Sequence, residues 1–577
     1  MEIRKGKKLH EVDEIKDYKE LLQRTISKYP ENIAYKFKNK RTETEFDYVN
    51  KTYSEFGKEI KEFSTALLDL KLEGKRIVLV GDNSYKWCVS YLAITTGNMV
   101  VVPLDKALPE NEMEGLIKRS EAEAVIYDAK YEKLMLRIKK EGNTSIKNLI
   151  TMSKDANKEV ILHDELLNKG KELLEKGSTI YDNIKIDKDK MSIMLFTSGT
   201  TAEPKAVMLS QANVCASIVG TASNVKMYPT DTLLSFLPLH HTFECSVTFL
   251  YGIYYGVTVA FCDGLKHIVQ NLKEYGVTIF VAVPLVLETM YKKILKGIED
   301  KGKTKLINKM MKISNALLKI KIDIRKKVFK QILENFGGKL RLVFYGAAAM
   351  NKDTIIGFNN FGIDLLQGYG LTETSPVIAC ETNKEVRPGA AGKLLYNVEA
   401  KIENPNNEGI GELVVKGKNV MLGYYKNEEE TKKVLNNGWF KTGDYAYFDK
   451  DDFLFITGRK KDVIVLKNGK NIYPQEIEFL INKIPYITES LIYEREKSST
   501  DTVLGAKIVY DIELIKTAMG NLKEEEYKNK IWEEIKEINK NLSIEKKIKQ
   551  IEVTTEPFKK TTTQKVKRFE ELKKIKS

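Results

Sequence analysis

Continuous apolar stretches alternate with amphipathic stretches along the first quarter of the chain. Residues 75–84 are predicted to form a buried strand that ends in a loop, and residues 84–97 a helix that stops at Gly97. Further strands are predicted at 98–105 and 121–130. Strands that alternate with helices are typical of parallel sheets joined by crossover helices. The pattern therefore predicts an α/β fold.

Two later segments carry long apolar or amphipathic patterns. Residues 246–262 contain no charge, but the run is shorter than the roughly 20 residues of a membrane-spanning helix. Its end is rich in β-branched residues, so a buried helix followed by a strand is predicted. Residues 301–338 are predicted to be helical, with one apolar face formed by Leu306, Met310, Ile313 and Leu317.

The pattern changes near Gly411, where short strands begin to be separated by Gly and Asp turns. These strands are predicted within residues 411–417, 445–458 and 461–469. We place a domain boundary near 457–461, because the remaining chain has the length of one ordinary domain. The prediction is a large N-terminal domain of mixed and parallel sheets with helices, residues 1–458, and a small mobile α+β domain, residues 459–577.

Composition and charge narrow the class of protein. The chain has 577 residues, 42% of them hydrophobic and 30% charged, which is a soluble globular profile. Its five cysteines form no CxxC pair and no apolar signal segment opens the sequence, so we expect no zinc site and a cytoplasmic location. The net charge of +14 is spread along the chain. Such a distribution favours a solvated surface, or a nucleotide, coenzyme or anionic membrane as partner, rather than nucleic acid.

The strongest chemical signal lies at residues 196–213, FTSGTTAEPKAVMLSQAN. An apolar strand runs into a loop of Thr, Ser and Gly, and Lys205 follows directly. Hydroxyls and backbone N–H groups suit phosphate oxygens, and a lysine adds a mobile cation. The GxxxxGK[ST] pattern of a P-loop is absent. The segment therefore predicts a phosphate-binding loop of another kind.

This segment resembles the phosphate loop of the adenylate-forming acyl-CoA synthetase superfamily, and other segments resemble that family in the same order. They are LPLHHTFE (237–244), YGAAAM (345–350), QGYGLTETSP (367–376), KTGD (441–444), ITGRKKD (456–462) and KKTTTQKVKR (559–568). The resemblance spans about residues 29–568. It implies an ATP-dependent acid–thiol ligase that forms acyl-AMP and pyrophosphate and then a thioester, with ATP, Mg²⁺ and coenzyme A as cofactors.

The resemblance also implies an ATP site. The residues that match the pyrophosphate-holding loop are Thr197, Ser198, Gly199, Thr200, Thr201 and Lys205. Those that match the adenine strip are Gly346, Ala347 and Ala348, with Tyr369 able to stack on the base. Asp444 matches the carboxylate that accepts both ribose hydroxyls, and Arg459 its partner.

Catalytic and transport roles follow from the same resemblance. Thr372 matches the residue at the α-phosphate, Glu373 the Mg²⁺ ligand, and His241 a residue beside the acyl tunnel. In the C-terminal domain the matches are Lys461 at the hinge of about 459–461, Gly469 on the route of the coenzyme A pantetheine arm, and Lys565, which enters the site for adenylation. His240 receives no role.

Several positions depart from the family pattern. Ala202 and Ala206 stand where glycine is usual, SQAN (210–213) replaces SHxN, and Gln564 replaces the glycine before the terminal lysine. If either alanine needed a left-handed backbone, it would cost about 1–2 kcal/mol. Because no charged group is lost, these departures affect loop dynamics more than the reaction class.

The acid is expected to be a medium- or long-chain fatty acid. Gly370 stands where acetate-specific relatives carry a pocket-blocking tryptophan, and the basic segment 301–336 is similar to long-chain members. The pocket lining is expected from residues 247–261 and from Ala379 onward. Two alternatives stay open: an acyl carrier protein as thiol acceptor, or a non-catalytic acyl- or nucleotide-binding relative.

The lysines of 301–336 also raise a membrane question. One interpretation is a segment that lies against anionic lipid at the inner face of the membrane, as a peripheral contact. The other is a helix whose apolar face packs on the protein while its lysines face water, which is the usual arrangement of a surface helix.

Overall fold

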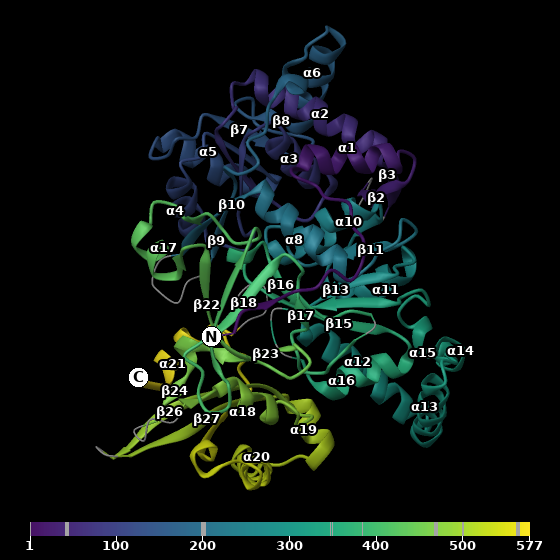
Figure 1. Cartoon of the computed structure of the whole chain (residues 1–577), viewed down its shortest axis with the longest axis vertical. Coiled ribbons are helices and arrows are strands. Elements are labelled where there is room, and N and C mark those ends of the chain that lie inside the picture. The colour runs from purple at the N-terminus through teal and green to yellow at the C-terminus, as the bar shows by residue number, and fades with distance from the viewer. Residues whose placement is uncertain are drawn as a thin grey trace.

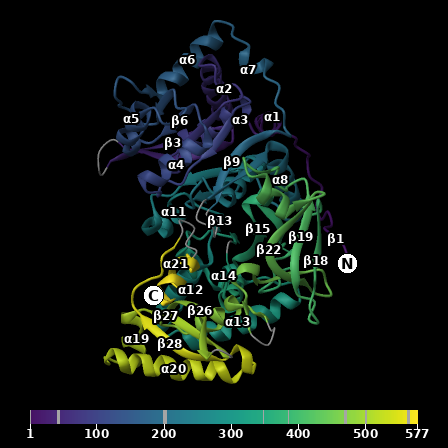
Figure 2. The same cartoon turned by 90° about the vertical axis from the view of Figure 1, so that its left-hand side faces the viewer.

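The computed structural model describes residues 2–40, 45–197, 204–346, 348, 350–383, 385–466, 471–498, 501–560 and 566–576. Three sheets and their helices make up a large N-terminal part, and a smaller part with sheets and helices of its own forms one end of the molecule (Figures 1 and 2). The predicted α/β class, with a large N-terminal and a small C-terminal domain, is confirmed.

The first sheet has eight strands in the order β20-β10-β9-β5-β4-β6-β7-β8. Its strands from β9 to β8 are parallel, whereas β10 and β20 run antiparallel at one edge. The predicted strand–helix alternation of residues 75–130 supplies β4, β5 and β6. The bounds are β4 (Arg76–Val80), β5 (Val100–Pro103), β6 (Ala124–Tyr127), β7 (Asn148–Thr151), β8 (Ile161–Leu162), β9 (Met191–Thr197), β10 (Lys205–Ser210) and β20 (Gly423–Tyr424).

The second sheet has nine strands in the order β17-β16-β15-β14-β13-β11-β12-β2-β3. Its central strands are parallel, and antiparallel pairs close both edges. The bounds are β2 (Ile33–Lys40), β3 (Phe46–Thr52), β11 (Thr232–Ser235), β12 (Thr258–Phe261), β13 (Ile279–Ala282), β14 (Leu342–Tyr345), β15 (Asp364–Gly370), β16 (Val377–Cys380) and β17 (Lys393–Leu394).

The third sheet is antiparallel throughout and lies beside the other two (Figure 2). It brings β22 against β23, and so sets Asp444 opposite Arg459. The bounds are β1 (Arg4–Lys5), β18 (Val398–Glu403), β19 (Gly411–Gly417), β21 (Leu435–Asn436), β22 (Trp439–Phe448) and β23 (Leu454–Arg459).

Helices cover and separate these sheets, and local signals start several of them. The Ser84 hydroxyl accepts the Trp87 N–H at the start of α3, which satisfies one of the open donors of a helix N-terminus. The main helices are α1 (Tyr18–Lys28), α2 (Tyr53–Asp69), α3 (Tyr85–Thr96), α4 (Glu110–Ser120), α5 (Glu132–Glu141), α6 (His163–Glu175), α7 (Ile180–Asn183), α8 (Gln211–Asn224), α11 (Ile268–Glu274), α12 (Pro284–Asp300), α13 (Thr304–Lys319), α14 (Arg325–Val328), α15 (Lys330–Glu334), α16 (Lys352–Phe361) and α17 (Glu428–Val434).

The C-terminal part has its own apolar core, with buried residues from Ile464 to Ile551. Its three-stranded sheet pairs β26 with β27 antiparallel and β27 with β28 parallel. The bounds are β24 (Ile464–Val465), β25 (Asn471–Ile472), α18 (Pro474–Ile481), β26 (Ile487–Ser498), β27 (Asp501–Tyr510), α19 (Ile512–Met519), α20 (Glu524–Lys540), β28 (Ile548–Thr554) and α21 (Arg568–Lys576). Sheet and helices that follow this order form an α+β unit, as predicted.

The uncharged run 246–262 is buried, and it forms helix and then strand as predicted. Its elements are a π-helical turn (η2, Cys245–Leu250), α10 (Tyr251–Tyr255) and β12. Within the described ranges, no helix combines the length and the apolar character that crossing a bilayer requires.

The predicted apolar face of residues 301–338 is partly wrong. The helix α13 packs on the body through Ile307, Met310 and Met311, whereas Leu306 and Ile313 are about half exposed. The packed face is thus rotated from the one that the spacing predicts, because the helix lies on α12 and α16 along one side only.

Candidate active site

Two paired strands hold the ends of the phosphate loop. Thr197 ends β9 and Lys205 begins β10, and the two residues face each other across the antiparallel ladder. The Thr197 hydroxyl donates to the Lys205 carbonyl oxygen at 3.4 Å. Strand pairing therefore brings both ends of the loop together, at the sheet edge next to β20. The remaining loop residues of the prediction, Ser198, Gly199, Thr200 and Thr201, with the departure Ala202, lie outside the described residues.

The Lys205 ammonium has two neighbours from the segment β20–α17. Its Nζ lies 2.5 Å from Glu430 Oε2 and 4.9 Å from the centre of the Tyr424 ring. The Tyr424 hydroxyl donates to Glu373 Oε1 at 3.0 Å. The residues predicted to hold pyrophosphate and metal are thus joined through one tyrosine. The hydrogen bonds from Lys205 and then from Lys433 lower the pKa of Glu430 to about 2.

Thr372 and Glu373 lie in the short turn η4 (Thr372–Thr374), directly after β15. The Glu373 carbonyl oxygen accepts the Met421 N–H at 2.8 Å, so the turn is tied to the chain that leads into β20. The Thr372 hydroxyl lies 3.4 Å from the Thr242 hydroxyl. Both predicted residues are half-buried, which leaves them open to a ligand on one side.

Asp444 is buried and already paired. Arg459 Nε lies 2.9 Å from Asp444 Oδ1, and the Tyr369 hydroxyl donates to Asp444 Oδ2 at 2.5 Å. Burial first, and then the charge of Asp444, raise the pKa of the Tyr369 hydroxyl well above its usual range. This hydrogen bond fixes the Tyr369 hydroxyl on Asp444.

Arg459 lies between Asp444, which is predicted to bind the ribose, and Glu373, which is predicted to bind the metal. Burial alone would lower the pKa of its guanidinium, but the negative charges of Asp444 and then Glu373 outweigh burial and raise it. We call the set Lys205, Tyr369, Glu373, Tyr424, Asp444 and Arg459 the nucleotide corner. It brings together five predicted site residues that lie on β10, β15, η4, β22 and β23.

The predicted adenine strip follows β14. Gly346 is buried beside β15, and a Cβ there would lie 2.9 Å from the Gly368 carbonyl oxygen. Any side chain at Gly346 would therefore displace the neighbouring backbone. Ala348 is exposed, and Ala347 lies outside the described residues. A glycine next to the backbone of β15 suits the close approach of a flat base.

His241 lies at the start of α9 (Thr242–Glu244), immediately before the residue that contacts Thr372. Its ring centre is 4.1 Å from that of His240. Burial, and then the nearby Lys106 charge, lower the pKa of His240 to about 3, so its ring is neutral. Glu244 is fully buried and accepts from the Ser235 and Thr248 hydroxyls. Burial raises its pKa to about 8.

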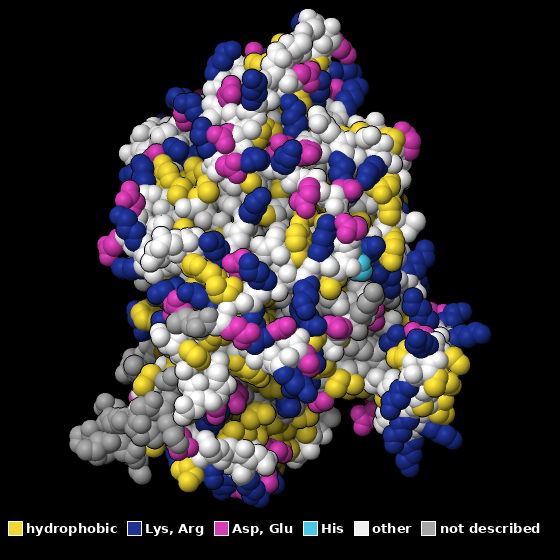
Figure 3. Space-filling model, viewed as in Figure 1, with side chains coloured by type: hydrophobic (Ala, Val, Ile, Leu, Met, Phe, Trp, Pro, Cys, Tyr) yellow, Lys and Arg dark blue, Asp and Glu magenta, His cyan; other side chains and the backbone are white. Residues whose placement is uncertain are grey.

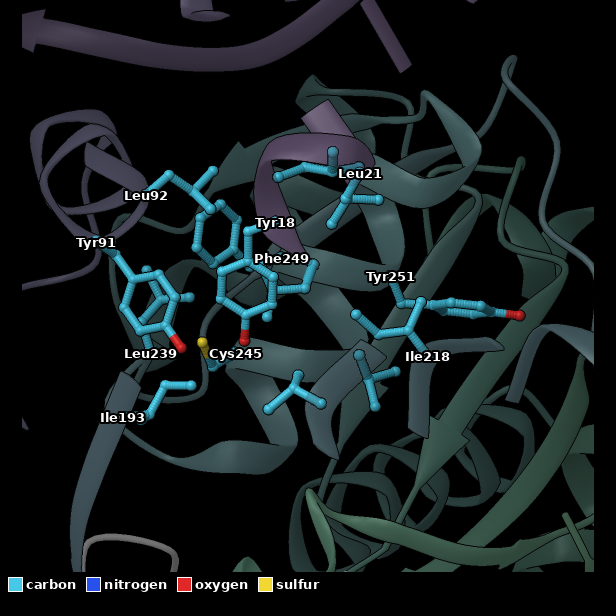
Figure 4. Packing of buried hydrophobic residues seen from close by; sticks show 14 of the residues in the cluster. Tyr18, Leu21, Tyr91, Leu92, Ile193, Ile218, Leu239, Cys245, Phe249 and Tyr251 are labelled. Atoms are coloured by element: carbon cyan, nitrogen blue, oxygen red, sulfur yellow. The ribbon is translucent and has the colours of Figure 1, made fainter. Parts of the chain in front are cut away.

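Two narrow pockets share Ser246, and Thr242 lines the first of them. We call them the acyl pockets, after the role predicted for this region. The first is lined by Tyr91, Pro103, Ile193, Leu195, Leu209, Val214, Leu239, His240, Thr242, Cys245 and Ser246. The second is lined by Ser217, Ile218, Thr221, Ser246, Val247, Tyr251 and Val377. Figure 4 shows Tyr91, Ile193, Leu239 and Cys245 grouped on one side of this core and Ile218 and Tyr251 on the other.

Only part of the pocket lining comes from the segment that the sequence predicts. Val247 and Tyr251 come from the expected segment, but the other lining residues come from elsewhere, among them α8, β9, α3 and the segment 239–246. A Cβ at Gly370 would lie 1.7 Å from the Pro376 carbonyl oxygen, so no side chain fits there with this backbone. Glycine at position 370 is therefore required by this close backbone approach, and α8 and η2 line the second pocket.

Two departures from the family pattern have structural explanations. Ala206 lies in β10, pairs with Phe196 and is buried, and it is not among the residues with positive φ. It therefore carries no left-handed strain. Gln211 is buried, donates to the Thr95 carbonyl oxygen and accepts the Tyr18 N–H, and so ties α8 to α3 and α1.

Of the predicted site residues in the C-terminal domain, the described ranges include Lys461. Lys461 is exposed in the turn η5 (Lys460–Asp462), directly after β23. Gly469, Gln564 and Lys565 lie outside the described residues. The hinge, the route of the pantetheine arm and the entry of a lysine thus stay predictions.

Comparison with known proteins decides the family. The model of the AMP-binding enzyme family matches residues 22–425, and the model of the AMP-binding enzyme C-terminal domain matches residues 461–576. The chain belongs to the AMP-binding enzyme family. This confirms the resemblance that the sequence motifs indicate.

Relatives of this AMP-binding enzyme include fatty acid ligases. A long-chain-fatty-acid–[acyl-carrier-protein] ligase of Arabidopsis thaliana is 27% identical over 88% of this chain and 78% of its own. A long-chain-fatty-acid–CoA ligase of Mycobacterium bovis is 26% identical over 81% of this chain and 78% of its own. Among solved structures, an anthranilate CoA ligase in complex with anthranoyl-AMP aligns with a TM-score of 0.77 and 17% identity over 97% of both chains, which shows a shared fold.

Tyr424 and Glu430 are site neighbours that sequence reasoning missed. Both lie in the stretch GYYKNEEET, whose acidic run is typical of a solvated helix start. Only the pairing of β20 with β10 brings them to Lys205. The run of apolar and aromatic residues before the acidic ones predicts a strand, but it does not predict which strand it pairs with.

Proposed function

We propose that this AMP-binding enzyme activates a medium- or long-chain fatty acid with ATP, forming acyl-AMP and pyrophosphate, and then transfers the acyl group to the thiol of coenzyme A. The observation that carries the proposal is the contact between the hydroxyls of Thr372 and Thr242. Thr372 adjoins Glu373 of the nucleotide corner, and Thr242 lines the first acyl pocket. The similarity to long-chain-fatty-acid–CoA ligases supports the choice of substrate.

The first step joins two anions, so the protein must supply positive charge and alignment. A carboxylate oxygen of the acid attacks the α-phosphorus, and pyrophosphate leaves. Lys205 neutralises the leaving group, Thr372 contacts the α-phosphate and Asp444 holds the ribose. In the second step the thiol sulfur attacks the acyl carbonyl carbon, the thiol proton is lost, and AMP leaves.

The residues present fit a magnesium ion. Glu373 has one oxygen hydrogen-bonded to Tyr424 and the second available as a ligand. Across the part of the chain that the structure describes, no three acidic, His or Cys side chains gather as a ready metal cage. Mg²⁺ in phosphoryl-transfer sites is held by one or two carboxylates together with substrate phosphates, and it neutralises phosphate charge there. Glu373 is therefore suited to hold Mg²⁺ together with the nucleotide.

The acid is tested by ATP–pyrophosphate exchange over a panel of carboxylic acids of increasing chain length. We expect exchange to be strongest with medium- or long-chain fatty acids and weak with acetate. Exchange with short or aromatic acids alone would contradict the fatty acid proposal. Absence of exchange with every acid, together with tight ATP binding, would favour the non-catalytic alternative.

The small domain is proposed to rotate near Lys461 between the two steps. Lys565→Ala should abolish acyl-AMP formation but still convert supplied acyl-AMP to acyl-CoA, and Gly469→Leu should do the reverse. Each variant serves as the control for the other. Equal loss of both half-reactions in both variants would contradict the rotation.

An acyl carrier protein is a second candidate acceptor, because the Arabidopsis relative is named as a ligase for that acceptor. Its phosphopantetheine arm carries the same thiol as coenzyme A. Supplying each acceptor to enzyme preloaded with acyl-AMP separates the two. A faster reaction with the carrier protein would replace coenzyme A in the proposal.

A peripheral contact with anionic membrane, on the cytoplasmic side, is proposed for α13 and the turn after it. Ile313, Ile320 and Ile322 expose 48%, 66% and 48% of their surface although α13 already has a packed face. Figure 3 shows apolar and basic side chains together on this projecting part. Exposed lysines surround them, namely Lys301, Lys303, Lys305, Lys309, Lys312, Lys319 and Lys321. Arg325 is instead paired with Asp323.

Liposome sedimentation tests this contact. Replacing Lys305, Lys309 and Lys312 by Gln should weaken binding to anionic vesicles by roughly a hundredfold, at about 1 kcal/mol per lysine. The matched control replaces three exposed lysines of α20, namely Lys530, Lys536 and Lys540. This variant should bind the vesicles nearly as well as the wild type. Binding that ignores lipid charge, or that both triple variants lose equally, would contradict the proposal.

A further inference from the structure

The Lys205 ammonium is bound to an acidic partner that its predicted role does not require. Lys205 Nζ and Glu430 Oε2 are 2.5 Å apart, and both side chains are partly exposed, with 22% and 30% of their surface accessible. Pyrophosphate oxygens would need the same ammonium. The carboxylate and the phosphates therefore compete for one cation.

Glu430 lies in the first turn of the short helix α17, which is hydrogen-bonded back to β20. The Glu430 N–H is capped by the Asn427 side chain at 3.1 Å, and the Thr431 hydroxyl accepts the Tyr424 N–H at 2.9 Å. The unit that holds Glu430 thus also carries Tyr424, which contacts Glu373. Glu430 faces Lys205 because of this backbone arrangement and not through chance contact of two long side chains.

A second lysine shares the Glu430 carboxylate. Lys433 Nζ lies 2.8 Å from Glu430 Oε1 and 2.7 Å from Glu429 Oε1. With Lys433 bound, Glu430 keeps a partner when Lys205 leaves. Lysine has a flexible stem and a compact charge, so its ammonium can turn from one oxygen partner to another.

We propose that Glu430 is a positioning residue that holds the Lys205 ammonium beside Tyr424 in the nucleotide-free enzyme and yields it to the phosphates of the incoming nucleotide. Glu430 thereby weakens the binding of ATP and of pyrophosphate, and promotes the release of pyrophosphate after adenylation. The inference rests on the proposed role of Lys205 in phosphate binding.

The test is Glu430→Gln, which keeps the shape and removes the charge. Dissociation constants of MgATP and of inorganic pyrophosphate, measured by calorimetry, should fall about threefold to tenfold, since partly exposed ion pairs have modest strength. In ATP–pyrophosphate exchange, KM for ATP should fall while kcat changes less. Glu429→Gln, at an exposed position paired with the same Lys433, is the matched control and should leave both constants within twofold.

Two further variants distinguish the possible failures. Lys433→Met removes the competing cation, so Glu430 should hold Lys205 more strongly and MgATP should bind more weakly. In the double variant Lys205→Ala/Glu430→Gln the gain from Glu430→Gln should vanish, because coupled residues are not additive. A gain that persists in the absence of Lys205, or an equal gain from Glu429→Gln, overturns the proposal. So does unchanged or weaker nucleotide binding by a folded Glu430→Gln. If Lys205→Ala alone binds MgATP like the wild type, the proposed role of Lys205 fails as well.

Discussion

The nucleotide corner and the acyl pockets are linked through Thr372, which adjoins Glu373 and contacts Thr242, yet they are built in opposite ways. In the corner Lys205, Asp444 and Arg459 each have a partner of opposite charge within 3 Å. Among the described residues that line the acyl pockets, none is Lys, Arg, Asp or Glu.

The difference teaches how each ligand would be recognised. A charge buried without a partner is costly, so a site for phosphates must keep its cations paired until the ligand arrives. Binding in the corner is then an exchange of partners. Binding of an alkyl chain requires no such exchange, because it depends on apolar area and shape. Variants that remove a charge in the corner should change the binding of ATP. Variants that change side-chain volume in the acyl pockets should change the preference for acids of different length.

The largest effect is expected for Glu373→Gln. Gln still accepts a hydrogen bond from Tyr424 but no longer provides an anionic ligand for Mg²⁺, so adenylation should fall about a hundredfold or more. Exchange activity measured against Mg²⁺ concentration should show a higher metal requirement. Tyr424→Phe is the control, since it removes only the hydrogen bond and should cost a few-fold. A Gln variant with normal activity at normal Mg²⁺ would show that Glu373 does not bind the metal.

Asp444→Ala should come next. It removes the acceptor that we assign to the ribose and leaves Arg459 and the Tyr369 hydroxyl without a partner that each has now. The apparent dissociation constant for ATP should rise by roughly tenfold to a hundredfold. The free energy of unfolding should fall by about 1–3 kcal/mol. Titration with ATP and thermal unfolding check the two effects separately. Unchanged ATP affinity would remove Asp444 from the site.

On the acyl side, Ser246→Phe should fill the junction of the two pockets. The ratio of kcat/KM for long acids to that for short acids should fall about tenfold or more, because a few methylene groups lose their place. The apparent dissociation constant for ATP should stay the same, and it serves as the internal control. If the ratio is unchanged while the ATP constant rises, the division between corner and pockets is wrong.

The smallest effect is expected for Ala206→Gly. Ala206 has an extended backbone and is buried in β10, so glycine should lower the free energy of unfolding by about 0.5–1 kcal/mol. Turnover should stay within a few-fold, whereas Lys205→Ala should cost far more. A large gain in rate from Ala206→Gly would indicate an impaired loop and favour the non-catalytic alternative.

Much of this protein could be predicted from the sequence, because the relevant forces are local. Apolar runs between polar turns determine β4, β5 and β6, and the Ser84 and Ser210 caps determine where α3 and α8 begin. The motifs around Lys205, Thr372, Glu373, Asp444 and Arg459 indicate a nucleotide site. Their residue types are what phosphate, ribose and metal require, wherever the chain places them.

Only the tertiary structure decided how these parts meet. Glu430 reaches Lys205 across more than two hundred residues because β20 pairs with β10, and no local pattern determines which strands pair. The same holds for the face of α13 that is buried, which depends on α12 and α16, and for the pocket walls that α3 and α8 supply. Pairing and packing minimise exposed backbone and apolar area over the whole chain. Their outcome is therefore a property of the fold and not of any one segment.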